Sequence, residues 1–474
     1  MALRILFLSS EVAPFSKTGG LGDVSGALPW AMAARGHDVR VLTPLYRGVP
    51  RAGLQLVGAP LTLHFPFGPV ELRFFRQPMP SGQLFFLDAP ELFDRDEYYG
   101  YPDDARRFAT YSMGALAFAQ REGFVPDVVQ CNDWPTGLAL FALRNGFAHT
   151  PMGKALRVFT IHNLAYQGVF PKLELETLGI PWDQFTPEGV EFWDRLSFMK
   201  TALVSAQLIT TVSPSYAKEI QTPQFGVGLD GLLRHRAFVL HGILNGVDVA
   251  EWNPATDVFL PKQYTGKELA GRALCRKELI ASCRIDAPVA GMPLFGVIGR
   301  MAEQKGADLL QAALPKLLEQ GASAIVLGAG DDGVQKAWLA LAARYPRRLG
   351  VRVGFDNSLA HRIEGGCDFF LMPSRFEPCG LSQMYSLLYG AVPVVHGVGG
   401  LLDTVTDIDQ PTGNGIVFRK PTPEALFEAL VRAVELYRDP PRLAAVRLRG
   451  MKSNFAWTAA AAEYERLFTS PDRF

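Results

Sequence analysis

The sequence predicts an α/β protein with two doubly wound domains in tandem. Short apolar strands alternate with helix-patterned runs from the N-terminus to about residue 240, and the same alternation restarts at about residue 293. This alternation is typical of parallel sheets covered by helices. The chain of 474 residues also exceeds what one hydrophobic core usually serves, which favours two domains of roughly 200 residues or more each.

The first domain is expected to begin with a βαβ unit. The pattern predicts a strand over Arg4–Leu8, a glycine turn, a helix over Val24–Ala34 that stops at Gly36, and a strand over Val39–Leu42. Strands joined in this way lie parallel in one sheet. Further strands of this domain are expected at Asp127–Val129, Val158–Ile161 and Leu208–Val212.

The second series opens with a strand over Pro293–Gly299. The strands expected after it are Ala324–Leu327, Val351–Phe355, Phe369–Met372 and Val392–Val395. Residues 246–265 are rich in Pro, Asn, Asp and Thr and have no sustained period, as expected of a linker.

We therefore expect domains at 1–245 and 246–454, with residues 455–474 forming an amphipathic helix that packs back on the first domain. Ligands of such sheets bind beyond the carboxyl ends of the strands. The cleft between two facing sheets is accordingly the expected site.

Charge and cysteine usage exclude several function classes. Lys+Arg and Asp+Glu both number 47, so no net charge draws the chain to nucleic acid or to an anionic membrane, and a neutral partner such as a sugar polymer would suit it. No apolar run is long enough for a membrane span or a secretory leader. Five scattered cysteines without a zinc-like cluster favour a reduced, cytoplasmic protein with no structural metal.

A glycine-rich turn follows the first strand, with the sequence Lys17-Thr18-Gly19-Gly20-Leu21-Gly22-Asp23. Glycines let backbone N–H groups approach a ligand, and the helix N-terminus and Lys17 add positive charge. The turn therefore predicts a phosphate-bearing substrate, with a purely structural turn as the alternative. Its spacing matches neither the P-loop nor the G-x-G-x-x-G fingerprint, which disfavours an ATPase or a simple dehydrogenase.

Two polar clusters follow strands of the second domain. In Arg300-Met301-Ala302-Glu303-Gln304-Lys305-Gly306 two cations lie at a strand-to-helix turn, where they can clamp a diphosphate or simply remain solvated. After Met372 comes Pro373-Ser374-Arg375-Phe376-Glu377-Pro378-Cys379-Gly380-Leu381. We expect Gly380 and Leu381 to open a helix whose amides suit phosphate, with the Glu377 carboxylate beside them for sugar hydroxyls.

With these motifs the chain resembles the bacterial glycogen synthases and plant starch synthases, which are retaining glucosyltransferases of the GT-B fold with two Rossmann-like domains. The resemblance covers nearly the whole chain. It rests on KTGGLGDV at 17, DRDEYYGYPDDARRF at 94, NDWPTGL at 132, TIHNLAYQG at 160, TVSPSYAKEI at 211, HGILNGVD at 241, GRMAEQKG at 299, PSRFEPCGL at 373, GGLLDTV at 399 and FAW at 455.

The resemblance implies residues that bind a nucleotide-sugar donor from both domains. Lys17 with Gly19 and Gly20 would reach it from the first domain, and Arg300 and Lys305 would hold its phosphates from the second. The positions that bind the donor glucose and distal phosphate in this family correspond to Glu377, Cys379, Gly380 and Leu381.

The resemblance also implies groups beside the reacting sugar. It places Asp133 and His162 there, with Tyr99 and Asn245 lining the same cleft. Two of the candidate residues keep alternatives. Asp23 can cap the first helix or act at the glucose or the acceptor, and His162 can be a buried histidine that satisfies backbone groups.

The chain departs from the family pattern at two places. Asn132-Asp133-Trp134-Pro135 stands where the family often has HDWH, so a second histidine is absent. Tyr385 stands where many related GT-B enzymes carry a second glutamate, which fits the glycogen and starch synthase branch and counts against the sucrose and trehalose branches.

The activity implied is transfer of glucose from a nucleotide diphosphate, ADP-glucose first and UDP-glucose as the open alternative, to the end of an α-1,4-glucan such as glycogen. No cofactor and no metal are expected, and the sequence does not give the oligomeric state. The rival interpretations are a glycogen phosphorylase, a non-catalytic glucan-binding protein and an NAD-dependent oxidoreductase.

Overall fold

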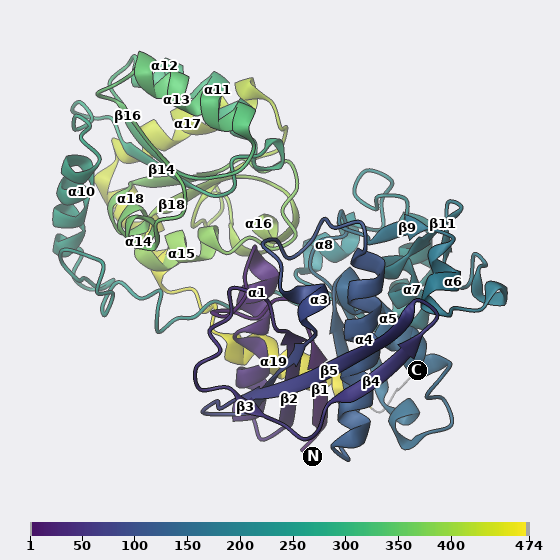
Figure 1. Cartoon of the computed structure of the whole chain (residues 1–474). Helices are drawn as coiled ribbons and strands as arrows, with labels where there is room; N and C mark the ends of the chain where they lie inside the picture. The colour runs from purple at the N-terminus through teal and green to yellow at the C-terminus, as the bar shows by residue number, and fades with distance from the viewer. Residues whose placement is uncertain (1, 471–474) are drawn as a thin grey trace. The chain divides into compact units, whose positions relative to one another are not determined.

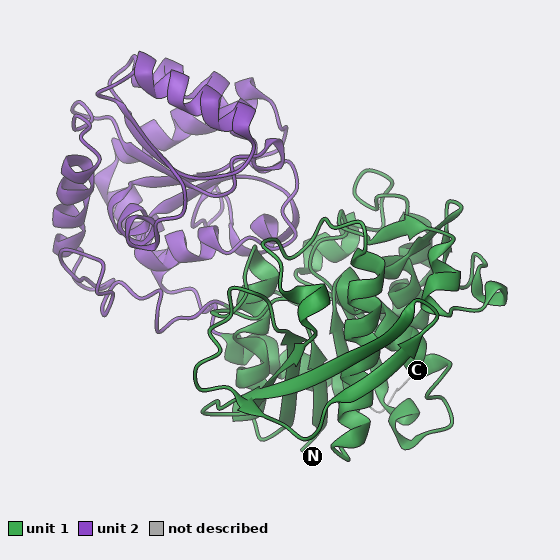
Figure 2. Ribbon diagram, viewed as in Figure 1, with its two compact units in different colours: residues 1–246, 457–474 green, residues 247–456 purple. Residues whose placement is uncertain are grey.

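The computed structural model describes residues 2–470, which form two compact units (Figure 2). Unit 1 takes in the chain up to Gly246 and resumes at Trp457, whereas unit 2 is the continuous segment Val247–Ala456. No helix within residues 2–470 is long and apolar enough to cross a membrane.

Unit 1 is organised around a ten-stranded sheet in the described part of the chain, in the order β13-β12-β8-β7-β1-β2-β6-β5-β3, with β4 paired to β5. From β13 to β6 the strands are parallel, while β3, β4 and β5 form antiparallel pairs. The strands are β1 (Arg4–Leu8), β2 (Asp38–Pro44), β3 (Gln55–Leu56), β4 (Leu61–Phe65), β5 (Gly68–Gln77), β6 (Gln83–Asp88), β7 (Val128–Asn132), β8 (Leu156–Ile161), β12 (Leu208–Thr211) and β13 (Leu240–Gly242). The order of the strands reverses between β1 and β7, and such a reversal is where open α/β sheets bind ligands.

Helices and a small second sheet complete unit 1 (Figure 1). The helices are α1 (Gly20–Ser25), α2 (Leu28–Ala34), α3 (Pro90–Phe93), α4 (Asp104–Arg121), α5 (Gly137–Arg144), α6 (Glu174–Leu178), α7 (Phe198–Ser205), α8 (Pro214–Glu219), α9 (Asp230–His235) and α19 (Trp457–Phe468). Short 3₁₀ turns are η1 (Trp134–Thr136), η2 (Pro151–Lys154), η3 (Trp182–Gln184) and η4 (Ala237–Val239). The small sheet has the order β10-β11-β9 and consists of β9 (Val169–Pro171), β10 (Glu191–Phe192) and β11 (Arg195–Ser197).

The last helix, α19, packs on α2 within unit 1. Tyr464 and Phe468 are buried on its inner face, and Nε of Arg35 donates to Oε2 of Glu465 at 2.6 Å. The chain thus leaves unit 1 after Gly246 and comes back to it at Trp457.

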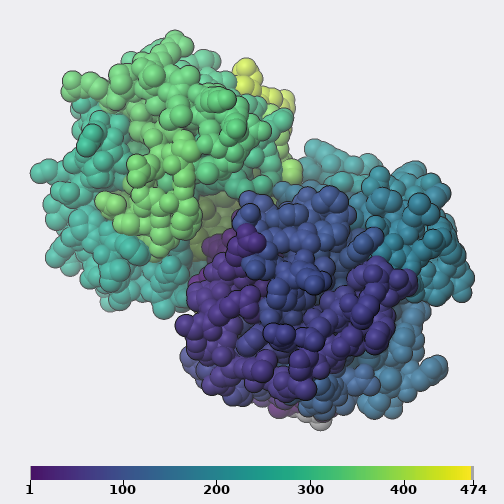
Figure 3. Space-filling model, viewed as in Figure 1, coloured from purple at the N-terminus to yellow at the C-terminus, as the bar shows by residue number. Residues whose placement is uncertain are grey.

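Three sequence expectations for unit 1 need correction. The helix expected over Val24–Ala34 is two helices, α1 and α2, because a side chain at Gly26 would meet the Ala13 carbonyl at 2.6 Å and Pro29 favours a new start. The pattern analysis also missed the antiparallel strands between β2 and β6, which belong to the purple and dark-blue part of the unit 1 surface in Figure 3. It missed the small sheet β9–β11 as well.

Unit 2 is a six-stranded parallel sheet within the described residues, in the order β16-β15-β14-β17-β18-β19. Its strands are β14 (Leu294–Ile298), β15 (Ser323–Gly328), β16 (Leu349–Val353), β17 (Phe369–Met372), β18 (Val392–His396) and β19 (Ile416–Phe418). Its helices are α10 (Ala270–Ser282), α11 (Ala307–Ala313), α12 (Pro315–Leu318), α13 (Asp332–Arg344), α14 (Asn357–Gly366), α15 (Ser382–Tyr389), α16 (Gly399–Thr404), α17 (Pro423–Tyr437) and α18 (Pro440–Met451), with a 3₁₀ turn η5 (Glu303–Lys305).

Both faces of the unit 2 sheet are covered by helices, and the apolar strands show why. Phe369 and Leu371 of β17 pack into one buried cluster, while Phe370 and Met372 pack into another on the opposite face. Strands buried on both faces are apolar at every position, as this one is. Strand β16 ends at Val353, two residues before the expected end, because Gly354 turns the chain with a φ of 122°.

Candidate functional site

The site in unit 1 is built on a buried carboxylate that follows β1. Glu11 accepts hydrogen bonds from the backbone N–H of Thr18 at 2.5 Å and from the Thr18 hydroxyl at 2.7 Å. It also accepts one from the hydroxyl of Tyr99 at 2.7 Å. Burial raises the pKa of Tyr99 well above its ordinary value, so this hydroxyl keeps its proton and acts as a donor. Glu11 therefore ties the glycine turn to the segment that carries Tyr99.

The glycine turn holds its lysine through an ion pair. Nζ of Lys17 lies 2.6 Å from Oδ1 of Asp23. Helix α1 begins at Gly20 with Gly19 as its N-cap, so Asp23 is not the N-cap residue of this helix. Asp23 instead lies in the first turn, where it orients Lys17.

The glycines of this turn differ in how much room the fold leaves for a side chain. A methyl group at Gly22 would meet Cβ of Lys17 at 3.0 Å and the Ser16 carbonyl at 3.1 Å, so a side chain there would crowd the turn. At Gly19 and Gly20 an added Cβ would have nothing within 4 Å, and Gly19 has an extended backbone that any residue adopts. The fold makes no demand for glycine at these two positions, which leaves the open backbone available for close approach of a ligand.

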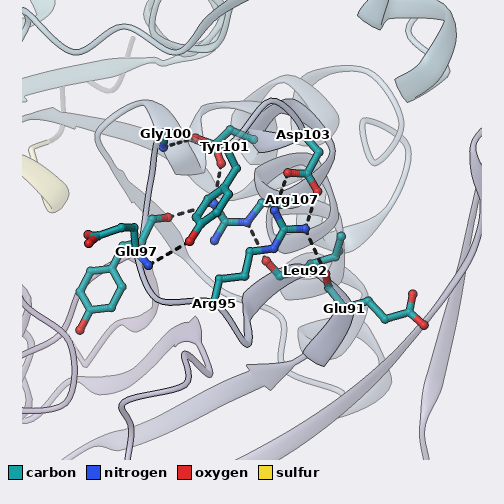
Figure 4. A network of polar contacts seen from close by, with 10 residues as sticks. Glu91, Leu92, Arg95, Glu97, Gly100, Tyr101, Asp103 and Arg107 are labelled. Carbon is teal, nitrogen blue, oxygen red and sulfur yellow. Dashed lines mark hydrogen bonds and ion pairs between the residues drawn. The ribbon is translucent and has the colours of Figure 1, made fainter.

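Two arginines hold the segment 94–103 that carries Tyr99 (Figure 4). The fully buried guanidinium of Arg107 donates to the carbonyls of Leu92 at 2.7 Å and Tyr98 at 3.0 Å, and it also pairs with Asp104. Arg95 binds both oxygens of Asp103 at 2.6 Å. Because a guanidinium presents several donors in a fixed fork, these contacts fix the backbone on the N-terminal end of α4.

Asp133 and His162 follow the neighbouring strands β7 and β8, and the structure brings them together. Oδ1 of Asp133 accepts the backbone N–H of His162 at 2.7 Å. Asp133 also has a φ of 55°, a strained conformation for a residue other than glycine. Strain of this kind occurs often at functional sites.

The protonation states of this pair follow from burial and from one amide. Burial raises the pKa of Asp133 to about 7 and lowers the pKa of His162 to about 3, so the imidazole is neutral. Asn132 uses its amide N–H on the Leu8 carbonyl at 2.8 Å, so its oxygen faces Nε2 of His162 at 3.0 Å. His162 therefore carries its proton on Nε2 and keeps the lone pair on Nδ1.

The site in unit 2 lies where its strand order reverses, between β14 and β17. Nζ of Lys305 lies 2.6 Å from Oε2 of Glu377, which also accepts the Ser374 hydroxyl at 3.0 Å. The Glu377 side chain is buried, and Lys305 is partly exposed. The two loops predicted from sequence therefore meet through a cation and a carboxylate.

Backbone contacts lock these two loops together. Gly306 has a φ of 70°, and a side chain there would meet the Pro373 carbonyl at 2.3 Å. Arg375 binds both oxygens of Asp308 at 2.8 and 2.9 Å, and its backbone N–H donates to the carbonyl of Gln304 at 2.8 Å. This packing fixes Lys305 against Glu377.

The remaining candidates of unit 2 lie around this pair. Arg300 is exposed, and its guanidinium donates to Oε1 of Gln304 at 2.7 Å. Cys379 is buried, and Gly380 has a φ of 73°. The helix expected to open at Gly380 and Leu381 starts at Ser382, with Leu381 as its N-cap.

The predicted residues thus form two groups, each within its own unit. In unit 1 the Lys17 turn, Tyr99, Asp133 and His162 are linked, since the Tyr99 ring lies 6.0 Å from that of Trp134, directly after Asp133. Asn245 is buried beyond β13 in the same unit. Within residues 2–470 no cluster of three or more His, Cys, Asp or Glu side chains could hold a metal ion.

Sequence reasoning missed Glu11, Arg107 and the amide of Asn132. For Glu11 a signal was present, because it follows the end of β1 as Asp133 follows β7. The partners of Arg107 are mostly backbone carbonyls, which no residue pattern announces.

Comparison with known proteins identifies the family. One family model, described as a starch synthase catalytic domain, matches residues 4–235, and a second, glycosyl transferases group 1, matches residues 292–435. The glycogen synthase of Myxococcus xanthus (strain DK1622) is 51% identical over 476 residues, which cover 98% of this chain and 99% of that protein.

Solved structures agree with this similarity. The catalytic domain of Starch Synthase IV from Arabidopsis thaliana, bound to ADP and acarbose, matches with a TM-score of 0.93 and 31% identity over 99% of both chains. Sucrose-phosphate synthase from Thermosynechococcus elongatus matches with a TM-score of 0.62 and 17% identity over 98% of both chains, which shows a shared fold. The chain has the GT-B fold and belongs to the glycogen synthase and starch synthase family of glycosyltransferases.

Proposed function

We propose that this glycosyltransferase extends glycogen by transferring glucose from ADP-glucose to the 4-hydroxyl at the non-reducing end of an α-1,4-glucan, with retention of configuration. The observation that carries the proposal is the Lys305–Glu377 pair at the strand-order reversal of unit 2, which offers a cation for phosphate and a carboxylate for sugar hydroxyls. Relatives that are about half identical over the whole chain are named glycogen synthase, and the starch synthase neighbour binds ADP.

On this proposal the diphosphate of the donor is held by Arg300, Lys305 and Lys17, together with backbone amides near Gly380. Charge develops on the leaving diphosphate as its bond to the sugar breaks. Preorganised cations and amides stabilise that charge in the transition state more than in the ground state. Lys305 and Lys17 each have a carboxylate partner at 2.6 Å, which orients their ammonium groups.

The chemistry exchanges one C–O bond for another. The bond between C1 of glucose and the ADP oxygen breaks, and a bond between C1 and O4 of the acceptor forms on the same face. The O4 proton passes to the departing phosphate oxygen, so ADP and the lengthened glucan are the products. Asp133 and neutral His162 are the groups we assign to the positively charged sugar that forms between these events.

The reaction as proposed needs no cofactor and no metal. The cations named above supply the charge stabilisation that a bound metal gives in other phosphoryl-group chemistry. Dialysis against EDTA is expected to leave the rate of ADP release unchanged, and recovery of a lost rate by added Mg²⁺ would contradict this. We also propose a cytoplasmic location, supported by five cysteines that form no disulfide within residues 2–470.

One assay tests the function. The purified protein is supplied with glycogen and either ADP-glucose or UDP-glucose, and release of the nucleotide diphosphate is followed with time. We expect ADP release with growth of the glucan and a lower kcat/KM for UDP-glucose. An equal kcat/KM for the two donors would contradict the preference for ADP-glucose. Absence of nucleotide diphosphate release from both donors would contradict the proposed function.

A further inference from the structure

Three exposed side chains of unit 1 lie beside the loop that begins at His162. We call the set formed by Tyr166, Trp193 and Val227 the aromatic rim, after its two aromatic members. Their exposed fractions are 54%, 77% and 48%. Trp193 lies between β10 and β11 of the small sheet, and Tyr166 lies between β8 and β9.

Buried contacts fix the rim to the His162 loop. The side-chain amide of Gln167, which is buried, donates to the carbonyl of Val227 at 3.0 Å. A Cβ placed on Gly228 would lie 3.4 Å from Nε1 of Trp193, so the segment 227–228 lies directly against the indole. The rim is therefore continuous with the chain segment that positions His162.

The backbone at Trp193 is one that tryptophan does not favour. Trp193 and Asp194 have φ values of 51° and 59° and form the two-residue connection of the β10–β11 hairpin. A two-residue connection with both φ values positive is the type I′ turn, in which Asn and Gly are preferred. The tryptophan at the first position of this turn is therefore not explained by the conformation of the turn.

Strain is concentrated in this part of the molecule. Val227 has a φ of 48°, which is unfavourable for a β-branched residue. Within residues 2–470, five residues other than glycine have a positive φ, and four of them are Asp133, Trp193, Asp194 and Val227. Observed strain of this kind is grounds for a functional hypothesis.

The turn is held rigidly in spite of the strain. Nζ of Lys172 binds both carboxylate oxygens of Asp194 at 2.7 and 2.8 Å, and Oε1 of Glu191 accepts the Asp194 backbone N–H at 2.7 Å. The ammonium group of Lys172 neutralises the Asp194 carboxylate next to the indole. These contacts also keep the indole raised on a fixed support, which lowers the entropic cost of binding a ligand to it.

We propose that the aromatic rim is a subsite for the acceptor glucan, in which the indole of Trp193 stacks on a pyranose ring several units away from the end that reacts. The inference rests on the function proposed above, which supplies a neutral polymer as the acceptor. The apolar C–H face of a pyranose suits a fixed, exposed aromatic ring. Continuity with the His162 loop favours the acceptor glucan over a protein partner or a second copy of the chain.

The test uses Trp193→Asn, because asparagine suits a type I′ turn and so removes the indole without weakening the fold. The matched control is Phe238→Asn. Phe238 is 70% exposed and lies in η4, which leads into the amino end of β13, whereas His162 follows the carboxyl end of the parallel strand β8. Both variants are compared with the unaltered protein for retardation in gels that contain glycogen, without any donor.

For Trp193→Asn we expect weaker retardation and a KM for glycogen about tenfold higher, as for loss of one stacked ring. The KM for ADP-glucose, the kcat and the melting temperature should not change. The KM for a trisaccharide acceptor should not change either, because so short an acceptor does not reach the subsite. Phe238→Asn should change none of these quantities.

The outcomes separate the subsite from the proposed function. If Trp193→Asn is retarded by glycogen as strongly as Phe238→Asn, the subsite is overturned while ADP release still supports the function. If the unaltered protein releases no ADP but its retardation by glycogen depends on Trp193, the proposed function is overturned, while Trp193 is still shown to bind glucan. A change of elution volume on size exclusion for Trp193→Asn alone would assign the rim to an interface between copies instead.

Discussion

The hydroxyl of Tyr99 donates a hydrogen bond of 2.7 Å to Oε1 of Glu11, and Glu11 in turn holds Thr18 of the glycine turn. Tyr99→Phe removes this donor from a buried carboxylate, so the turn that carries Lys17 should loosen. We expect kcat/KM for ADP-glucose to fall by about tenfold or more. The control is Tyr345→Phe, which removes a similar Tyr–Glu bond of 2.6 Å on the exposed surface of unit 2. Equal rates for the two variants would contradict the link.

Arg107→Lys should act on donor use through the segment that carries Tyr99. A lysine can bind one of the carbonyls of Leu92 and Tyr98 but cannot reproduce the fork that binds both. We expect the free energy of unfolding to fall by about 2 kcal/mol and KM for ADP-glucose to rise.

The matched control for Arg107 lies at the other end of α4. Arg121 also binds two carbonyls, those of Val57 and Ala59. Arg121→Lys should lower the melting temperature without changing KM. If both variants lose stability and neither changes KM, Arg107 has a structural role alone.

Gly19→Ala should separate binding from folding. An added methyl at Gly19 meets no protein atom within 4 Å, so the melting temperature should not change, while closer approach of the donor should be hindered. Gly22→Ala is the opposite case, because its methyl would meet Lys17 at 3.0 Å and should lower the melting temperature. Titration calorimetry measures the affinity of each variant for ADP. Unaltered ADP affinity in Gly19→Ala would show that the donor does not contact this turn.

Substitutions of Lys305 and Glu377 should compensate each other in stability but not in activity. Lys305→Met leaves the buried Glu377 carboxylate without its cation, which should lower stability, and it should reduce kcat/KM by about 2 to 4 kcal/mol of transition-state stabilisation. Adding Glu377→Gln should recover the melting temperature without recovering the rate. Recovery of the rate in the double variant would show that neither group meets the donor.

Asp133→Asn should change how stability depends on pH. Because the pKa of Asp133 is raised from 3.8 to about 7 in the folded state, the unfolded state binds fewer protons between these pH values, and stability falls as pH rises through them. Asparagine never ionises and can still accept the His162 N–H. Above pH 7 the variant should therefore be more stable than the unaltered protein by about 4 kcal/mol, and catalytically impaired. Thermal melts at pH 5 and pH 8 measure this, and an equal change for both proteins would contradict the raised pKa.

Much of the fold could be predicted because local patterns determine it. The strand β17 is apolar at every position, and clusters of polar residues follow the strands that end at the site, so Asp133 and His162 could be placed at the ends of β7 and β8. The helix over Val24–Ala34 was predicted too long because the contact between Gly26 and Ala13 depends on tertiary packing.

The supporting contacts could not be predicted for the same physical reason. Tyr99 and Glu11 are 88 positions apart, and only the folded sheet brings them together. Trp193 could have drawn attention as a tryptophan beside an aspartate in a short hairpin. Its positive φ, which makes it informative, is visible only in the structure.

The return of the chain to unit 1 in α19 has a consequence for biosynthesis. A ribosome completes all of Val247–Ala456 before it makes the helix that covers α2. Val247 and Ala456 pair with each other in the folded structure, so the two ends of this continuous segment lie side by side. The second unit can therefore finish folding while the first still exposes the apolar surface that Tyr464 and Phe468 later cover. For this chain the domain that begins first is the one that matures last.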